Sequence, residues 1–167
     1  MAKLLAHQML GLATTYFILR PENIMQAIMY GFTAIIGSTV PDLDAARGHR
    51  RTLHNIIACV LTGLAVYTVL LIANAWISMS FNLYPLGSAL SYITAYITHI
   101  LADIPTGGGV ALLYPLSRKR ISVLGLRYDN VLYNGLLMIL STILLCLFFA
   151  SALPPYRIIR AWYTPHS

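Results

Sequence analysis

Apolar residues gather in five stretches along the chain, joined by segments that carry most of the charged residues. The stretches cover residues 4–19, 24–40, 56–77, 86–101 and 131–153. The third and fifth are long enough to cross about 30 Å of hydrocarbon as helices that rise about 1.5 Å per residue. The first two are shorter and form either two tilted spans or a hairpin that enters the bilayer only in part. The pattern predicts an all-α fold, a multi-pass transmembrane bundle of four to five helices.

The composition supports this prediction. Hydrophobic residues make up 58% of the chain and charged residues only 10%, whereas soluble domains carry about 25% charged residues. A chain of 167 residues has room for one such bundle and its connections. We therefore expect residues 1–167 to form a single integral membrane domain.

Positive charge is distributed unevenly between the two sides of a chain that crosses five times. One side has only Arg20, Arg157 and Arg160, and the other holds Lys3, Arg47, Arg50, Arg51, Arg118, Lys119, Arg120 and Arg127. The positive-inside rule places the richer side in the cytoplasm of a cell-membrane protein. Because topology accounts for the net charge of +6, nucleic-acid binding is not expected. The expected partners are membrane lipids and a small-molecule or lipid substrate.

Histidines and aspartates are concentrated at the cytoplasmic ends of these stretches. The segment VPDLDAARGHRRTLHN, at residues 40–55, contains several of them. Ionisable side chains at membrane depth are costly, so they usually face the bundle interior and have a partner or a function. We expect a buried polar site near the cytoplasmic face, formed by His7, Asp42, Asp44, His49, His54, His99 and Asp103.

The residue types in this set suit a metal ion. His99 and Asp103 are spaced i, i+4 and share one helical face, which fits two metal ligands and equally an intrahelical hydrogen bond. Imidazole nitrogens with carboxylate oxygens favour zinc, manganese or ferrous iron over calcium or magnesium. Two hypotheses follow: a centre of one or two divalent ions, or a set of His–Asp pairs that fixes helix packing. Thr52 is the expected cap of the helix that follows it.

Four elements follow one another in order: His7 with Gly11, PDLD at 41–44, HRRTLHN at 49–55, and HILADIPTGGGVALLYPLSRKR at 99–120. In order and spacing they resemble the YdjM-like membrane-bound metal-dependent hydrolases, small multi-pass prokaryotic proteins of which some are regulated by LexA. The resemblance covers residues 7–134. It departs from the pattern at Leu53 and Asn55, where many relatives have Thr and Ser beside the histidine. It implies metal-ligand or catalytic roles for His7, Asp42, Asp44, His49, His54, His99 and Asp103.

The resulting hypothesis is a membrane-embedded hydrolase. It would cleave an ester or phosphoester, a lipid among the candidates, with water activated by zinc, or by manganese or iron. Asp44, Asp103 and His54 are the catalytic candidates. Arg50, Arg51 and Arg118 form a basic rim that would attract a phosphate group of the substrate. The same residues also fit a transporter for divalent cations or protons, and a metal-stabilised scaffold without catalysis.

Overall fold

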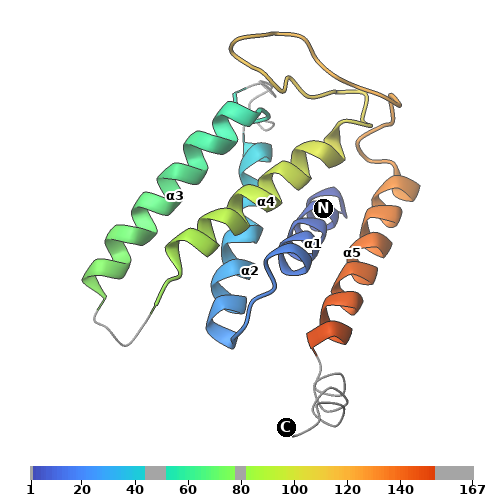
Figure 1. The fold of residues 1–167 in the computed structure, drawn as a ribbon. Coiled ribbons are helices and arrows are strands. Elements are labelled where there is room, and N and C mark those ends of the chain that lie inside the picture. Colours follow the sequence, from blue (N-terminus) through green and yellow to red (C-terminus); the bar gives the residue numbers. More distant parts are fainter. Residues whose placement is uncertain (1, 44–51, 78–81, 153–167) are drawn as a thin grey trace, which may run out of the picture.

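The computed structural model describes residues 2–43, 52–77 and 82–152, and this part of the chain holds five α-helices and no strand. Successive helices run in alternating directions, so every second chain connection lies at the same end of the bundle (Figure 1). All five apolar stretches are helical, which confirms the all-α prediction. The elements are α1 (Ala2–Leu19), α2 (Ile24–Thr39), the 3-10 turn η1 (Val40–Leu43), α3 (Ile56–Trp76), α4 (Pro85–Asp103) and α5 (Val131–Ala152).

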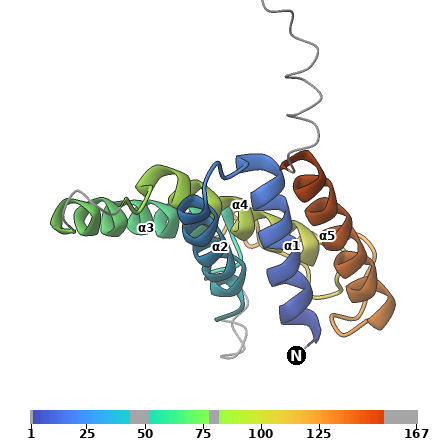
Figure 2. The ribbon, with the colours of Figure 1, turned by 90° about the horizontal axis from the view of Figure 1, so that it is seen from below.

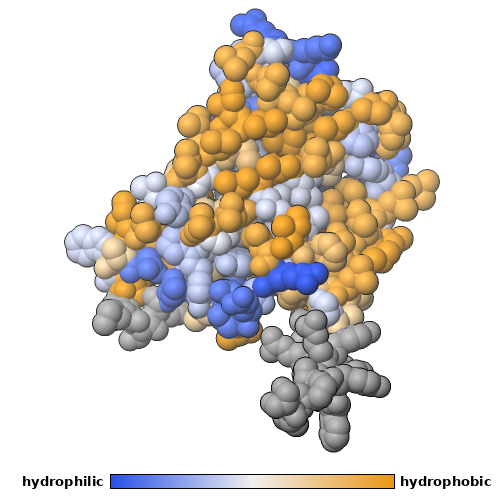
Figure 3. Space-filling model, in the orientation of Figure 1, coloured by the Kyte–Doolittle hydropathy of each residue, from blue (hydrophilic) through white to orange (hydrophobic). Residues whose placement is uncertain are grey.

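Three segments are long and apolar enough to cross a membrane: Ile24–Leu43, Ile56–Trp76 and Val131–Ser151. The last two, α3 and α5, are the most apolar, as their sequences predict. Large apolar side chains such as Leu61 and Leu132 are exposed on them. Figure 3 shows this apolar surface as a broad band between hydrophilic residues at the two ends of the molecule. These features identify a membrane protein.

Helix α4 is the centre of the bundle. It packs against α1, α2 and α3, while α5 packs against α1 (Figure 2). Its buried face combines small residues with the aromatic rings of Tyr92 and Tyr96. Because one face of α4 packs against protein and only the other, with Leu86 and Leu101, is exposed, the helix does not need the apolar composition of α3 and α5.

Small residues allow α1, α2 and α4 to approach one another closely. A Cβ atom at Gly37 would overlap the backbone carbonyl of Tyr92. A Cβ atom at Gly11 would lie only 3.1 Å from the Cβ atoms of Ala95 and Ser38. Close contacts through small residues are a common way for membrane helices to associate. The position of α4, and of the polar residues at its end, therefore depends on these glycines.

Replacing Gly37 by alanine is expected to lower the free energy of unfolding by about 1–3 kcal/mol, because the added methyl group meets backbone that is fixed within α4. The matched control is Gly135→Ala in α5, where a Cβ atom meets nothing within 4 Å. Alanine there should raise stability by up to about 1 kcal/mol through its higher helix propensity. Thermal unfolding in detergent measures both variants, and equal changes would contradict the close packing at Gly37.

Candidate metal centre

Three imidazoles and two carboxylates lie together at one end of the bundle. His7 comes from α1, Asp42 from η1, His54 from the segment before α3, and His99 and Asp103 from the last turns of α4. Ligand atoms of all of these except His7 lie within 4.8 Å of one another. The ring centroid of His7 is 4.5 Å from that of His99. Below, these five residues are called the His–Asp cluster.

Local structure places the side chains from η1 and from the start of α3. Pro41 is buried, and the turn around it ends α2 and presents Asp42. Asn55 caps α3, since its side chain accepts a hydrogen bond from the amide of Ala58 at 2.7 Å. The prediction that Thr52 is the cap is wrong, because the helix begins at Ile56 and the cap position falls on Asn55. His54 directly precedes this cap.

Asp103 is the hub of the His–Asp cluster. Its Oδ1 lies 3.2 Å from His7 Nε2 and 3.2 Å from the ammonium of Lys3. Its Oδ2 lies 3.2 Å from His54 Nε2. Only 6% of the Asp103 side chain is exposed, so these neighbours replace water as the partners of its carboxylate.

The hydroxyl of Tyr133 donates to the carbonyl of Ala102 at 2.6 Å and ties α5 to this end of α4.

His99 provides the first test of whether an ion fits. Its ring is fully buried, and neither ring nitrogen has a hydrogen-bond partner among the described residues. Its Nε2 is 3.6 Å from Asp42 Oδ1 and 3.7 Å from Asp103 Oδ2. Ligand atoms held about 2.1 Å from a tetrahedral ion are about 3.4 Å apart. The spacing around His99 Nε2 is thus long for direct hydrogen bonds and close to that of atoms that share an ion.

His7 provides a second, independent test. Its Nδ1 lies 2.9 Å from the carbonyl oxygen of Lys3, which only accepts hydrogen bonds, so Nδ1 carries the proton. In the neutral ring, Nε2 then directs a lone pair at Asp103 Oδ1, 3.2 Å away. Two acceptors at this distance need a cation between them, either an extra proton or a metal ion. Histidine ligands commonly donate their other N–H to a backbone carbonyl in this way.

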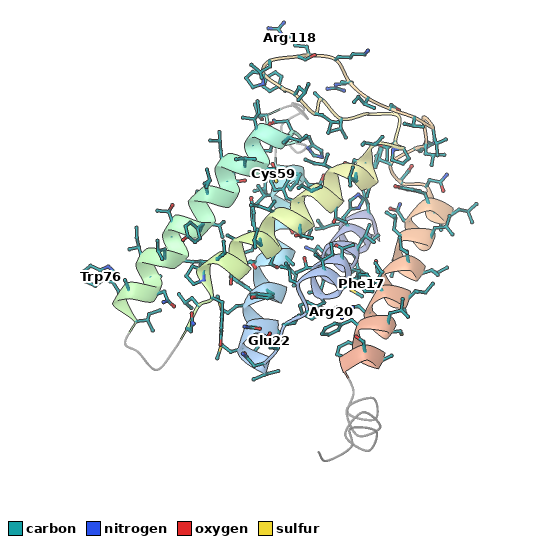
Figure 4. The ribbon with its side chains drawn as sticks, viewed as in Figure 1. Phe17, Arg20, Glu22, Cys59, Trp76 and Arg118 are labelled. Carbon is teal, nitrogen blue, oxygen red and sulfur yellow. The ribbon has the colours of Figure 1, made fainter. Side chains whose placement is uncertain are left out.

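The described residues therefore fit a divalent cation. Asp42, His54, His99 and Asp103 form a group that could hold one, and nitrogen with oxygen ligands does not select a single metal. Arg118 is exposed, and it points away from the helices at the outer edge of the loop (Figure 4). The remaining predicted site residues lie outside the described residues, so their roles, and a second ion, stay predictions: Asp44, His49, Arg50 and Arg51.

Lys3 is a member of the site that sequence reasoning missed. Its ammonium lies 3.2 Å from Asp103 Oδ1 and 3.9 Å from Asp42 Oδ1. The sequence signal was its i, i+4 spacing to His7, which places both on one face of α1. The positive-inside rule alone was enough to explain its charge in the sequence. Lys3 bridges the two carboxylates and competes with a metal ion for their negative charge.

Replacing Lys3 by methionine is expected to tighten divalent-ion binding about fivefold, because it removes a competing ion pair worth about 1 kcal/mol. Zinc titration of the purified protein measures the change. Lys119→Met is the control, since Lys119 is exposed in the 104–130 segment and has no ion pair with a described carboxylate. Weaker zinc binding by the Lys3 variant would mean that Lys3 supports the ligand geometry instead of competing with the ion.

Comparison with known proteins agrees with this architecture. A family model described as YdjM inner membrane protein matches residues 1–163, which include all five helices and every residue of the His–Asp cluster. Neither a comparison with curated proteins nor one with solved structures finds a match. The chain therefore belongs to the YdjM inner membrane protein family.

Proposed function

We propose that the protein is a metal-dependent hydrolase that cleaves an ester or phosphoester at the membrane surface. The observation that carries this proposal is the convergence of three imidazoles and two carboxylates in one buried cluster. Buried ionisable groups at the end of membrane helices are costly and usually functional. Zinc is the favoured ion because it accepts this mixture of nitrogen and oxygen ligands in tetrahedral sites.

A divalent ion bound here would supply Lewis acidity, polarising the scissile group and strengthening water as a nucleophile near neutral pH. The protein's own residues supply the rest. His7 and His99 hold the buried side of the cluster, where each ring is at most 1% exposed. Asp42, His54, His99 and Asp103 would hold the ion, and a carboxylate oxygen that does not bind it can accept the proton that water releases. Asp42 is 22% exposed and marks the side from which substrate enters.

We also propose that the end carrying the His–Asp cluster faces the cytoplasm. Lys3 contacts the cluster, and the segment joining α4 to α5 at this end carries Arg118, Lys119, Arg120 and Arg127. Arg20 follows α1 at the opposite end (Figure 4). An excess of basic residues in short loops is typical of the cytoplasmic side.

Hydrolysis can be tested on the purified protein in detergent with chromogenic phosphodiester, phosphomonoester and carboxylic-ester substrates. Turnover of at least one substrate class should require added zinc or manganese and should stop with a chelator. Asp103→Asn should lose it and Asp129→Asn should retain it, because Asp129 pairs with Arg127 outside the cluster. Full metal occupancy without turnover of any of the three classes would favour a scaffold over an enzyme.

No observation in the described part of the chain favours transport. A transport pathway would need polar groups that lead from the cluster toward the far end. Buried hydroxyls do follow the interface of α1, α2 and α4, but those of Thr15, Ser38 and Ser91 donate to backbone carbonyls. No other described acidic or basic side chain is buried below the His–Asp cluster. Among the described residues, charged side chains therefore provide no continuous path from the cluster to the far end of the bundle.

A further inference from the structure

A second polar feature lies in the segment between α4 and α5, apart from the His–Asp cluster. It is a cavity of about 430 Å³. Two cations line it, Lys119 and Arg120, together with the hydroxyls of Ser117 and Ser122. Apolar side chains, among them Leu113 and Ile121, complete the lining. A cavity that joins cations and hydroxyls to an apolar wall suits a ligand that is anionic at one end and apolar at the other.

The two cations of this cavity have no acidic partner in the part of the chain that the structure describes. The ion pairs found there involve Lys3, the histidines and Arg127, and none involves Lys119 or Arg120. Arg120 donates from Nη1 to the carbonyl of Gly108 at 3.1 Å, which holds the guanidinium in place and leaves other N–H groups for a ligand. Cations without an acidic partner, next to hydroxyl groups, are suited to phosphate.

Apolar exposure around the cavity points to a lipid. Leu113 is 55% exposed, Leu116 82% and Ile121 41%. These side chains accompany basic residues at the end of the bundle where the membrane surface is expected. Basic residues next to exposed apolar ones are typical of segments that contact anionic lipid headgroups. We propose that this cavity binds the phosphate headgroup of an anionic phospholipid through Lys119 and Arg120.

The cavity is tied to the segments that carry the His–Asp cluster. The carbonyl of Leu112, in the cavity wall, accepts a hydrogen bond from the amide of Ile56 at 3.0 Å, just after His54. Ser122 donates to the carbonyl of Thr106 at 2.7 Å, shortly after Asp103. Lipid bound here would be held next to the candidate metal centre. This inference goes beyond the proposed hydrolysis and does not depend on it.

The test measures lipid binding without metal, so its outcome is separate from that of the hydrolysis assay. The delipidated, chelator-treated protein is titrated in detergent with dihexanoyl phosphatidylglycerol, and thermal stabilisation is recorded. Dihexanoyl phosphatidylcholine and inorganic phosphate serve as separate arms. We expect stabilisation by phosphatidylglycerol and little by either of the others, because the cavity matches a net negative headgroup with an apolar tail.

Three single variants locate the site. Arg120→Gln and Lys119→Gln should each weaken phosphatidylglycerol binding about tenfold, the usual effect of losing a hydrogen bond to a charged group. Arg118→Gln is the matched control, since Arg118 lies in the same basic run but does not line the cavity. Arg120→Gln also removes the hydrogen bond to Gly108 and could disturb folding. Lys119→Gln does not have this effect, because of the two residues only Arg120 donates to Gly108. Equal weakening by all three variants, or equal stabilisation by phosphate alone, would overturn the proposal.

Discussion

Replacing His99 by leucine is expected to abolish stabilisation by metal while leaving the metal-free protein as stable as the wild type or more so. The reason is that His99 has two buried ring nitrogens without hydrogen-bond partners among the described residues. Such groups cost about 1–3 kcal/mol each when buried and unpaired. Leucine removes that cost and the metal ligand together. A purely structural histidine would behave in the opposite way.

The His99 prediction is measured by thermal unfolding in detergent with and without zinc. In the wild type, zinc at about 100 times its dissociation constant should add about 2.7 kcal/mol of stability. The matched variant is His7→Leu, whose ring bonds Lys3 and Asp103, so its loss should destabilise the metal-free protein as well. Destabilisation of the metal-free protein by His99→Leu to the same degree would favour the packing hypothesis.

Replacing Asp103 by asparagine is expected to have the largest effect on metal affinity. The substitution removes a negative charge that faces His7, His54 and Lys3 at once. We expect at least about 100-fold weaker zinc binding, the upper end of the effects seen for groups that only support ligands. The metal-free protein should also lose about 3 kcal/mol of stability, because His7, His54 and Lys3 all lose the same buried carboxylate partner.

Asp129→Asn is the control for the change in charge. Asp129 lies outside the membrane-spanning segments and accepts two hydrogen bonds from Arg127, both at 3.1 Å. These bonds keep the pKa of the Asp129 carboxyl below its usual range, so it is ionised at neutral pH. Both substitutions therefore remove one negative charge. Isothermal titration with zinc compares them, and similar losses of affinity would show that net charge, not coordination, governs binding.

The helices could be predicted from sequence because helices that face lipid and helices that face protein have different patterns of apolar and polar residues. α3 and α5 face lipid on most sides, so their sequences are almost uniformly apolar and their ends are clear. α4 packs one face against other helices and uses Ser91 and Ala95 there, where close packing requires small residues. Its weaker apolar signal reflects its central position. The glycine contacts that set this position, at Gly11 and Gly37, require coordinates.

Much of the candidate site was also predictable, because alternating helices must bring one end of each together. That argument placed His7, Asp42 and His54 near the His99–Asp103 pair. It missed Lys3, whose charge already had an explanation in topology. It also misplaced the cap of α3, since a polar residue three positions early is as plausible in sequence as the true cap, Asn55. The direction in which each histidine ring nitrogen points could not be predicted, because it is set by the three-dimensional structure.

We infer that the His–Asp cluster binds a divalent ion. Elemental analysis of the protein, purified from cells without chelator and washed free of loosely bound ions, tests it most directly. We expect about one divalent ion per chain in the wild type and in Asp129→Asn, and almost none in Asp103→Asn. A wild type without metal that also fails to take up added zinc, or equal metal content in all three proteins, would contradict it.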